Sequence, residues 1–150
     1  MADIRKILNT RSTMLRNDLG ETISDHVHLD LVSYDEEKGV YLMRTTLKKW
    51  MCNPMGRIHG GMITTLMDQA MGCVSFSVMP GDGIAPTLEM NVSFFRPLFA
   101  DTDAFLEVKL KSISKQLIHL TCDVSSVDAP NKVCASSTAV FFYKPASEMR

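Results

Sequence analysis

The sequence predicts an α+β fold in which one long antiparallel β-sheet wraps around a single central helix. Residues 60–80 form a long stretch that is apolar on nearly every side and contains one charged residue, Asp68. A helix of this kind must be covered by other structure on most sides. The segments around it alternate apolar and polar residues, which is typical of strands that bury one face of a sheet.

The first expected element is a short amphipathic helix over Ile4–Leu15, where charges are interleaved with apolar residues. We treat residues 1–24 as a helical extension of a single domain that covers residues 1–150, because the chain has no linker, repeat or low-complexity segment.

A hairpin follows this extension. Residues 26–32 predict its first strand, beginning at His26, and the polar residues Tyr34–Gly39 predict the turn. Val40–Leu47 predict the returning strand, and a loop that contains Pro54 then leads to the central helix.

After the helix, which Pro80 and the following glycine end, four more strands are expected. Short turns predict that consecutive strands are antiparallel neighbours. The four segments are Leu88–Phe94, Leu106–Lys111, Ile118–Val124 and Lys132–Tyr143.

Composition excludes several classes of protein. The chain is 45% apolar and 22% charged, with a formal net charge of −1, which argues against nucleic acid as a partner. The N-terminus has no apolar signal core, and the apolar stretch contains Gln69 and Gly72, so we expect no membrane span and a cytoplasmic location. Of the four cysteines, Cys73, Cys122 and Cys134 fall inside apolar segments, as expected of buried free thiols in a reducing compartment.

Asp68 is the first candidate for chemistry. A carboxylate buried without a partner costs several kcal/mol or takes up a proton, so a lone Asp in an apolar helix needs a reason. It either caps a loop or pairs with an arginine, or it is a tuned carboxylate that serves as general base or nucleophile.

Gly60 and Gly61 are the second candidate. Two glycines at the start of a helix expose backbone N–H groups at the positive end of the helix dipole, where a developing negative charge can be held. The alternative is that they serve only close packing. His59, directly before them, either orients the loop or polarises a carbonyl.

Spacing along the helix then predicts an oligomer. Gly60 and Asp68 are eight residues apart, which places them about 12 Å apart along the axis at ~1.5 Å per residue. Two catalytic groups must each come within about 3 Å of one reacting carbonyl. If both are catalytic, two copies of the helix must pack antiparallel, with each Asp68 facing Gly60 of the other copy.

These residues form a recognisable motif. Asn53–Gly61 reads N-x-x-G-x-x-H-G-G, and Asp68 follows nine residues after the histidine. This pattern, together with Thr87–Pro97, resembles the hotdog-fold acyl-CoA thioesterases of the phenylacetate-pathway type. The resemblance covers nearly the whole chain from about residue 26, and it implies a sheet wrapped around a long helix, with dimers that join their sheets edge to edge.

The resemblance implies a role for each motif residue. Asp68 matches the catalytic carboxylate, and Gly60 matches the glycine whose N–H polarises the thioester carbonyl. Asn53 matches the residue that positions the attacking water or the thioester, and Thr87 falls where a Ser or Thr orients the nucleophile. His59 matches the motif histidine, whose role varies within the family.

Further residues are candidates for binding substrate. Methionines near the helix are flexible enough to line an acyl pocket, and basic residues near strand ends are candidates for the CoA phosphates. For each of these, core packing or a solvated surface charge is the simpler interpretation. The candidates are Gly61, Met62, Met90, Arg96, Lys111 and Lys115, with Met55, Met67 and Met71 as further pocket residues.

The implied reaction converts an acyl-CoA and water into a carboxylate and free CoA, without a cofactor. His26 and His28 share a strand face but lack a third ligand, so no metal site is expected. The sequence leaves open the acyl group, a CoA or carrier-protein thioester, and attack by water or by Asp68 itself. A dimer is required, and a tetramer is the expected larger assembly. The rival hypotheses are a hotdog dehydratase or hydratase, a non-catalytic acyl-CoA sensor, and a partner-binding domain with a vestigial site.

Overall fold

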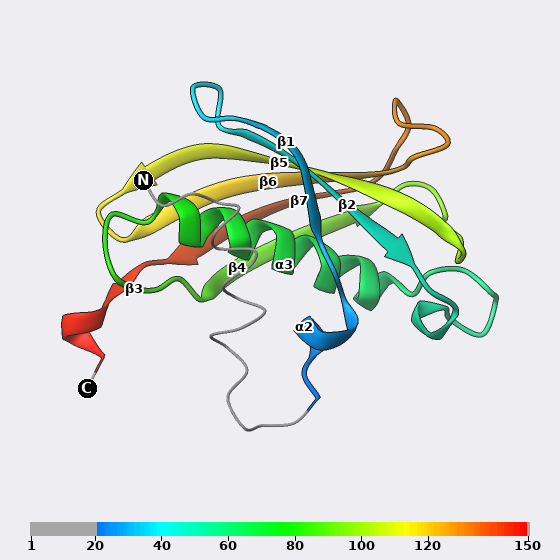
Figure 1. The fold of residues 1–150 in the computed structure, drawn as a ribbon, viewed down its shortest axis with the longest axis horizontal. Coiled ribbons are helices and arrows are strands. Elements are labelled where there is room, and N and C mark those ends of the chain that lie inside the picture. Colours follow the sequence, from blue (N-terminus) through cyan, green and yellow to red (C-terminus); the bar gives the residue numbers. More distant parts are fainter. Residues whose placement is uncertain (1–20, 150) are drawn as a thin grey trace.

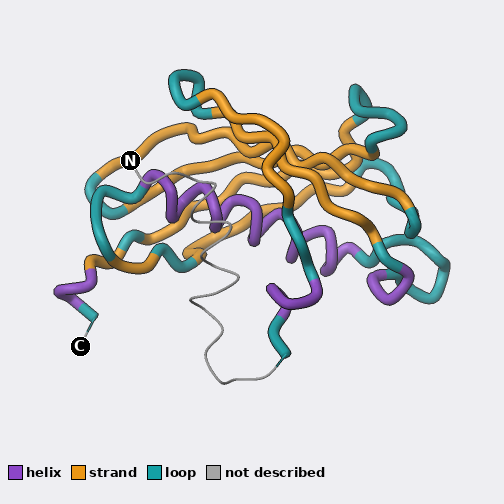
Figure 2. The backbone as a smooth tube through the Cα atoms, in the orientation of Figure 1, coloured by secondary structure: helices purple, strands orange, loops and turns teal. Residues whose placement is uncertain are grey.

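The computed structural model describes residues 21–149. One helix, α3, lies along one face of a six-stranded antiparallel sheet (Figure 1), and the strands curve across it (Figure 2). The predicted α+β hotdog architecture is confirmed. The elements are α2 (Ile23–His26), β1 (Asp30–Asp35), β2 (Val40–Leu47), η1 (Lys49–Met51), α3 (Gly60–Val78), β3 (Gly83–Ile84), β4 (Thr87–Phe94), β5 (Thr102–Ser114), β6 (Leu117–Ser126), β7 (Val133–Phe142), β8 (Lys144–Pro145) and η2 (Ala146–Glu148).

The apolar side of α3 packs against β4, β5, β6 and β7. Leu66, Met67 and Met71 are fully buried there, and each such side chain stabilises the fold by about 1.5–3 kcal/mol relative to an exposed one. α3 begins at Gly60, after the cap residue His59, and ends at Val78. No helix in the described part of the chain is both long and apolar enough to cross a membrane.

The opposite side of α3 is more open than the sequence predicted. Thr65, Asp68 and Gln69 form a stripe at helical spacing, and all three are half-buried and not enclosed. The sheet covers the other side of the helix. On the side of this stripe, Ser24 of α2 contacts Gln69 of α3. The expectation that other structure covers most of the helix holds, since most of its residues are buried, but Asp68 is half-buried and not deeply buried.

The first strand also begins later than predicted. Strand β1 starts at Asp30, and His26 ends the short helix α2. The reason is a local helix cap, which the alternation of apolar and polar residues did not indicate. The Asp25 carboxylate accepts hydrogen bonds from the backbone N–H and the hydroxyl of Thr22, each at 2.8 Å. The predicted helix over Ile4–Leu15 lies outside the described residues.

Strand β4 is not the neighbour of β5, although the two are consecutive in sequence. The sheet order is β1-β2-β5-β6-β7-β4, so β4 is an edge strand that pairs with β7. The connection after β4 passes the loop before α3, where the Ile58 N–H donates to the Leu98 carbonyl at 2.9 Å. Short loops therefore predicted neighbouring strands correctly for β5, β6 and β7, but not for β4.

The cysteines agree with the expectation of free thiols. Cys73, Cys122 and Cys134 are buried, and Cys52 is half-buried. Burial raises the pKa of the Cys122 thiol, because the charged thiolate is excluded from the apolar core.

We predict that 5,5′-dithiobis(2-nitrobenzoic acid) modifies one thiol rapidly in the native protein and the remaining three only after unfolding, because the exposed thiolate is the reacting form. Absorbance of the released thionitrobenzoate measures the two phases. In the Cys52→Ser variant the rapid phase should vanish; a rapid phase that persists would place a core cysteine at the surface.

Candidate active site

Asn53 organises the loop before α3. Its side-chain oxygen accepts hydrogen bonds from the backbone N–H groups of Met55 and Arg57, at 3.0 and 3.2 Å. The backbone N–H of Asn53 donates to the Arg57 carbonyl at 2.7 Å. Gly56 takes a positive φ of 75°, which glycine adopts without strain. The predicted site residue Asn53 thus holds the turn that leads to Gly60.

His59 caps the helix and thereby distinguishes the two glycines. Its Nδ1 accepts a hydrogen bond from the Gly61 N–H at 2.9 Å. The Gly60 N–H has no acceptor within the described residues. Of the two predicted backbone donors, Gly60 is therefore the one left free for a ligand at the positive end of the helix.

A β-bulge in β4 brings Thr87 to Asp68. The register between β4 and β7 shifts between Thr87 and Glu89, so that Leu88 is the extra residue. Without this shift, Thr87 would share a sheet face with Glu89. With it, Thr87 pairs with the buried Phe141 and points toward α3.

The consequence is a short hydrogen bond between the two predicted catalytic side chains. The Thr87 hydroxyl donates to Oδ1 of Asp68 at 2.5 Å. This contact fixes one carboxylate oxygen, and Oδ2 has no partner among the described residues. The carboxylate is therefore oriented, half-buried and open to a water molecule.

Asp68 and Thr87 line a cavity of about 310 Å³ between α3 and the segment that enters β4. Its other lining residues combine two polar side chains with a mainly apolar wall. They are Ser24, Gln69, Gly72, Phe76, Ile84, Ala85, Pro86 and Phe141. Four of these are functional candidates that the sequence analysis missed: Ser24, Gln69, Gly72 and Phe76.

Two of these four cavity residues could have been found from their spacing in the sequence. Gly72 and Phe76 lie four and eight residues after Asp68, on the same side of the helix. Ser24 had no such signal, because its place follows from a contact between segments 45 residues apart.

The glycine donor and the carboxylate do not meet within one chain. Both belong to the uninterrupted helix α3, so the spacing of about 12 Å along its axis holds. Beside Gly60 lies Phe94 at the end of β4; a Cβ atom at Gly60 would lie 3.3 Å from Cζ of this ring.

The structure separates the predicted cations. Lys111 belongs to β5 and Lys115 to the turn that follows it, whereas Arg96 follows β4 near the opposite end of the sheet. The Arg96 guanidinium donates to the Val133 carbonyl at 2.6 Å. Within one chain these three residues cannot hold one phosphate group together.

The predicted methionines are dispersed as well. Met67 and Met71 are fully buried in the core, and Met55 is 72% exposed. Met62 lines a separate hollow of about 270 Å³ with Trp50, and Met90 is half-buried on β4. The cavity at Asp68 thus contains no methionine.

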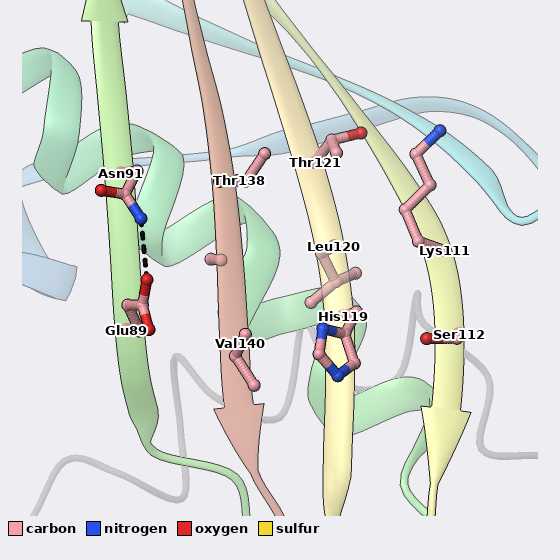
Figure 3. A pocket seen from close by; sticks show the side chains of 10 residues that line it. Glu89, Asn91, Lys111, Ser112, His119, Leu120, Thr121, Thr138 and Val140 are labelled. Carbon is pink, nitrogen blue, oxygen red and sulfur yellow. Dashed lines mark hydrogen bonds between the residues drawn. The ribbon is translucent and has the colours of Figure 1, made fainter.

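A further hollow of about 380 Å³ lies on the sheet face that points away from α3 (Figure 3). Lys111, His119 and Thr138 border it, and Asn91 donates to Glu89 at 2.9 Å. None of the predicted catalytic residues lines it. Across residues 21–149, no group of three His, Cys, Asp or Glu side chains is placed to hold a metal ion.

Comparison with known proteins gives this geometry a family context. A model of the thioesterase superfamily matches residues 55–134, which include Gly60, Asp68 and Thr87. Human acyl-coenzyme A thioesterase THEM5 is 29% identical over 111 residues, which cover 68% of this chain and 43% of that protein. The chain therefore spans less than half the length of this relative.

Two solved structures share the fold. The PaaI protein of the phenylacetic acid degradation operon of E. coli superposes with a TM-score of 0.73 at 17% identity, over 95% of this chain and 96% of that one. The smu.793 protein of Streptococcus mutans, solved bound to acetyl CoA, gives a TM-score of 0.70 at 21% identity, over 87% of this chain and 97% of that one.

We predict that Asn53→Ala lowers the free energy of unfolding by about 1 kcal/mol, because two backbone N–H groups lose their shared acceptor. Asn53→Asp keeps an oxygen at that place and should retain most of the stability. Urea denaturation of both variants measures the difference. Equal losses in the two variants would show that the side-chain oxygen does not stabilise the turn.

Proposed function

Because the chain belongs to the thioesterase superfamily, we propose that it hydrolyses acyl-CoA thioesters, with Asp68 as the general base. The observation that carries this proposal is the 2.5 Å hydrogen bond from Thr87 to Asp68 at the edge of a cavity large enough for a substrate group. The name of the human relative and the acetyl CoA bound to the S. mutans protein support a CoA thioester as the substrate.

In the proposed reaction, Asp68 takes a proton from a water molecule as the water oxygen attacks the thioester carbonyl carbon. The carbonyl electron pair moves onto its oxygen, and the Gly60 N–H of the partner subunit stabilises the oxyanion. When the pair returns, the carbon–sulfur bond breaks, and the CoA sulfur takes the proton from Asp68. The products are the free acid, which ionises in water, and CoA.

Two observations favour attack by water over attack by Asp68. Thr87 occupies Oδ1 of the carboxylate, which reduces its freedom to approach a carbonyl, and Oδ2 of this half-buried residue is left to bind a water molecule. In the other route, Asp68 would form a mixed anhydride with the acyl group.

The active site is proposed to form between two subunits that join their β4 edges. β4 ends the sheet, so one side of its backbone is unpaired by any other described strand. Leu88, Phe94 and Phe95, on and beside this edge, are 62%, 51% and 58% exposed. An antiparallel pairing of two such edges lays the two α3 helices side by side, with each Asp68 near Gly60 of the partner subunit. A tetramer would pair two of these dimers.

We place the protein in the cytoplasm. Four free cysteines, three of them buried, suit a reducing compartment in which disulfides do not form.

The decisive experiment measures thiol release from acetyl-, hexanoyl-, palmitoyl-, benzoyl- and phenylacetyl-CoA. We predict that Asp68→Asn lowers kcat by roughly 10²–10⁴, as expected for the loss of a general base, while the amide oxygen still accepts from Thr87. Asp128→Asn removes a surface carboxylate and serves as the control. Full activity in Asp68→Asn would disprove the role of Asp68, and wild type that binds but hydrolyses none of the panel would indicate an acyl-CoA binding protein.

The role of the Gly60 N–H can be tested by removing that one donor. Proline suits the first position of a helix, and His59 already has the extended backbone that precedes proline, with φ −61° and ψ 136°. We predict that Gly60→Pro lowers kcat by about 10²–10³, the usual effect of losing an oxyanion donor. Gly60→Ala keeps the N–H and is the matched control; an equal loss in both variants would point to steric obstruction.

The same pair of variants tests the shared site. Mixed dimers of Asp68→Asn and Gly60→Pro subunits contain one site with both functional groups intact, so mixing the two inactive proteins should restore part of the activity. Subunit exchange is followed by mass spectrometry of the assembly. Exchange without recovery would mean that Gly60 and Asp68 do not act on the same substrate.

A further inference from the structure

We propose that the cavity beside Asp68 receives the acyl group, and that Gly72 and Phe76 limit its size to a medium-length chain or a single ring. This inference rests on the proposed thioester hydrolysis and extends it to the class of acyl group. Neither residue belongs to the motif that identified the site.

The lining of the cavity indicates which arm of the substrate enters it. Asp68 and Thr87 lie at one end, and the wall beyond them is formed largely by Phe76, Ile84 and Phe141. The pantetheine arm of CoA carries amides that need hydrogen-bond partners, whereas an acyl group has none beyond its carbonyl. We therefore place the acyl group against this apolar wall, where it leaves no polar group without a partner. The pantetheine arm then lies toward solvent, where water can hydrogen-bond to its amides.

Three residues at helical spacing define the length of this cavity. Asp68, Gly72 and Phe76 follow one another at intervals of four residues, about 6 Å each along α3, and all three line the cavity. Gly72 has no side chain to fill the space between the carboxylate and the ring. Phe76 is half-buried and lies one turn further, where its ring bounds the cavity.

Volume then limits the acyl group. A methylene occupies roughly the 30 Å³ that a water molecule occupies in the liquid, so a cavity of about 310 Å³ is filled by about ten carbons. A sixteen-carbon chain would need roughly 480 Å³ on the same measure. The cavity therefore holds hexanoyl to decanoyl or one aromatic ring, whereas a palmitoyl chain would extend beyond it.

A contact between two elements borders this cavity on the side of α2. Gln69 on α3 donates to the Ser24 hydroxyl of α2 at 3.4 Å, and both residues line the cavity at Asp68. The neighbouring hollow around Trp50 and Met62 begins on the other side of this contact. The contact thus separates two hollows along α3, and Asp68 lines the one that also contains Phe76.

Two opposite substitutions test the proposal on a series of straight-chain acyl-CoAs from two to sixteen carbons. In wild type, kcat/KM should rise by roughly fourfold per added methylene while the cavity fills, and then fall beyond about ten carbons. Phe76→Ala should move the maximum to longer chains by several carbons. Gly72→Val should move it to shorter chains, with acetyl-CoA the least affected.

The matched control is Phe142→Ala. Phe142 is also half-buried, but it follows Phe141 on β7, so its side chain points to the opposite sheet face. This variant should keep the wild-type profile, and the ratio between substrates cancels any change in the folded fraction.

The outcomes separate the two proposals. If wild type hydrolyses the series but Phe76→Ala and Gly72→Val leave the position of the maximum unchanged, the acyl cavity lies elsewhere and the thioesterase proposal stands. The same holds if Phe142→Ala shifts the maximum as far as Phe76→Ala. If wild type hydrolyses no acyl-CoA, both proposals fail together.

Discussion

The burial of one side of α3 against the sheet is the constraint on which the remaining structure depends. Leu66, Met67 and Met71 have no solvent exposure, so the rotation of the helix about its axis is fixed. Fixing that rotation also fixes the opposite stripe, where Asp68 is held half-exposed. Because the helix is uninterrupted from Gly60 to Val78, the separation of the glycine donor from the carboxylate is as rigid as the helix itself. One side of α3 therefore packs in the core, and the opposite side carries the candidate catalytic carboxylate.

β4 turns this rigid helix into a site through two departures from regular structure. It returns to the far edge of the sheet, where it lies along α3, with Thr87 near Asp68 and Phe94 near Gly60. The bulge at Leu88 then changes which side chains face the helix. In a regular strand, Thr87 and Met90 would lie on opposite faces; the extra residue allows both to face α3. The short hydrogen bond to Asp68 thus depends on one residue that makes no contact with the carboxylate itself.

Sequence patterns predicted the parts of this arrangement that depend on local periodicity. The start of α3 at Gly60 and the strands β5, β6 and β7 followed from alternation and from the glycine and proline positions. The patterns failed at two kinds of place. A local cap between Thr22 and Asp25 puts His26 in a helical turn and not in the predicted strand. Pairing between distant segments puts β4 at the edge of the sheet, where Leu88 is exposed. The sequence around Gly72 predicts only an interruption of an apolar stretch, because the wall opposite this residue comes from β3, β7 and the β3–β4 connection.

The exposed β4 edge and the exposed Gly60 N–H both require a partner surface that covers them. A single N–H at a solvent-exposed helix terminus stabilises an anion weakly, because water screens the interaction and competes for it. The same donor becomes effective when a neighbouring surface excludes water. Gly60 lies beside Phe94, whose ring is 51% exposed at the end of the edge strand β4. A partner that covers this ring to complete the sheet also removes water from the donor. Pairing of the β4 edges would therefore bring Asp68 to the partner's glycine and, in the same step, create the low-dielectric surroundings in which that glycine can act.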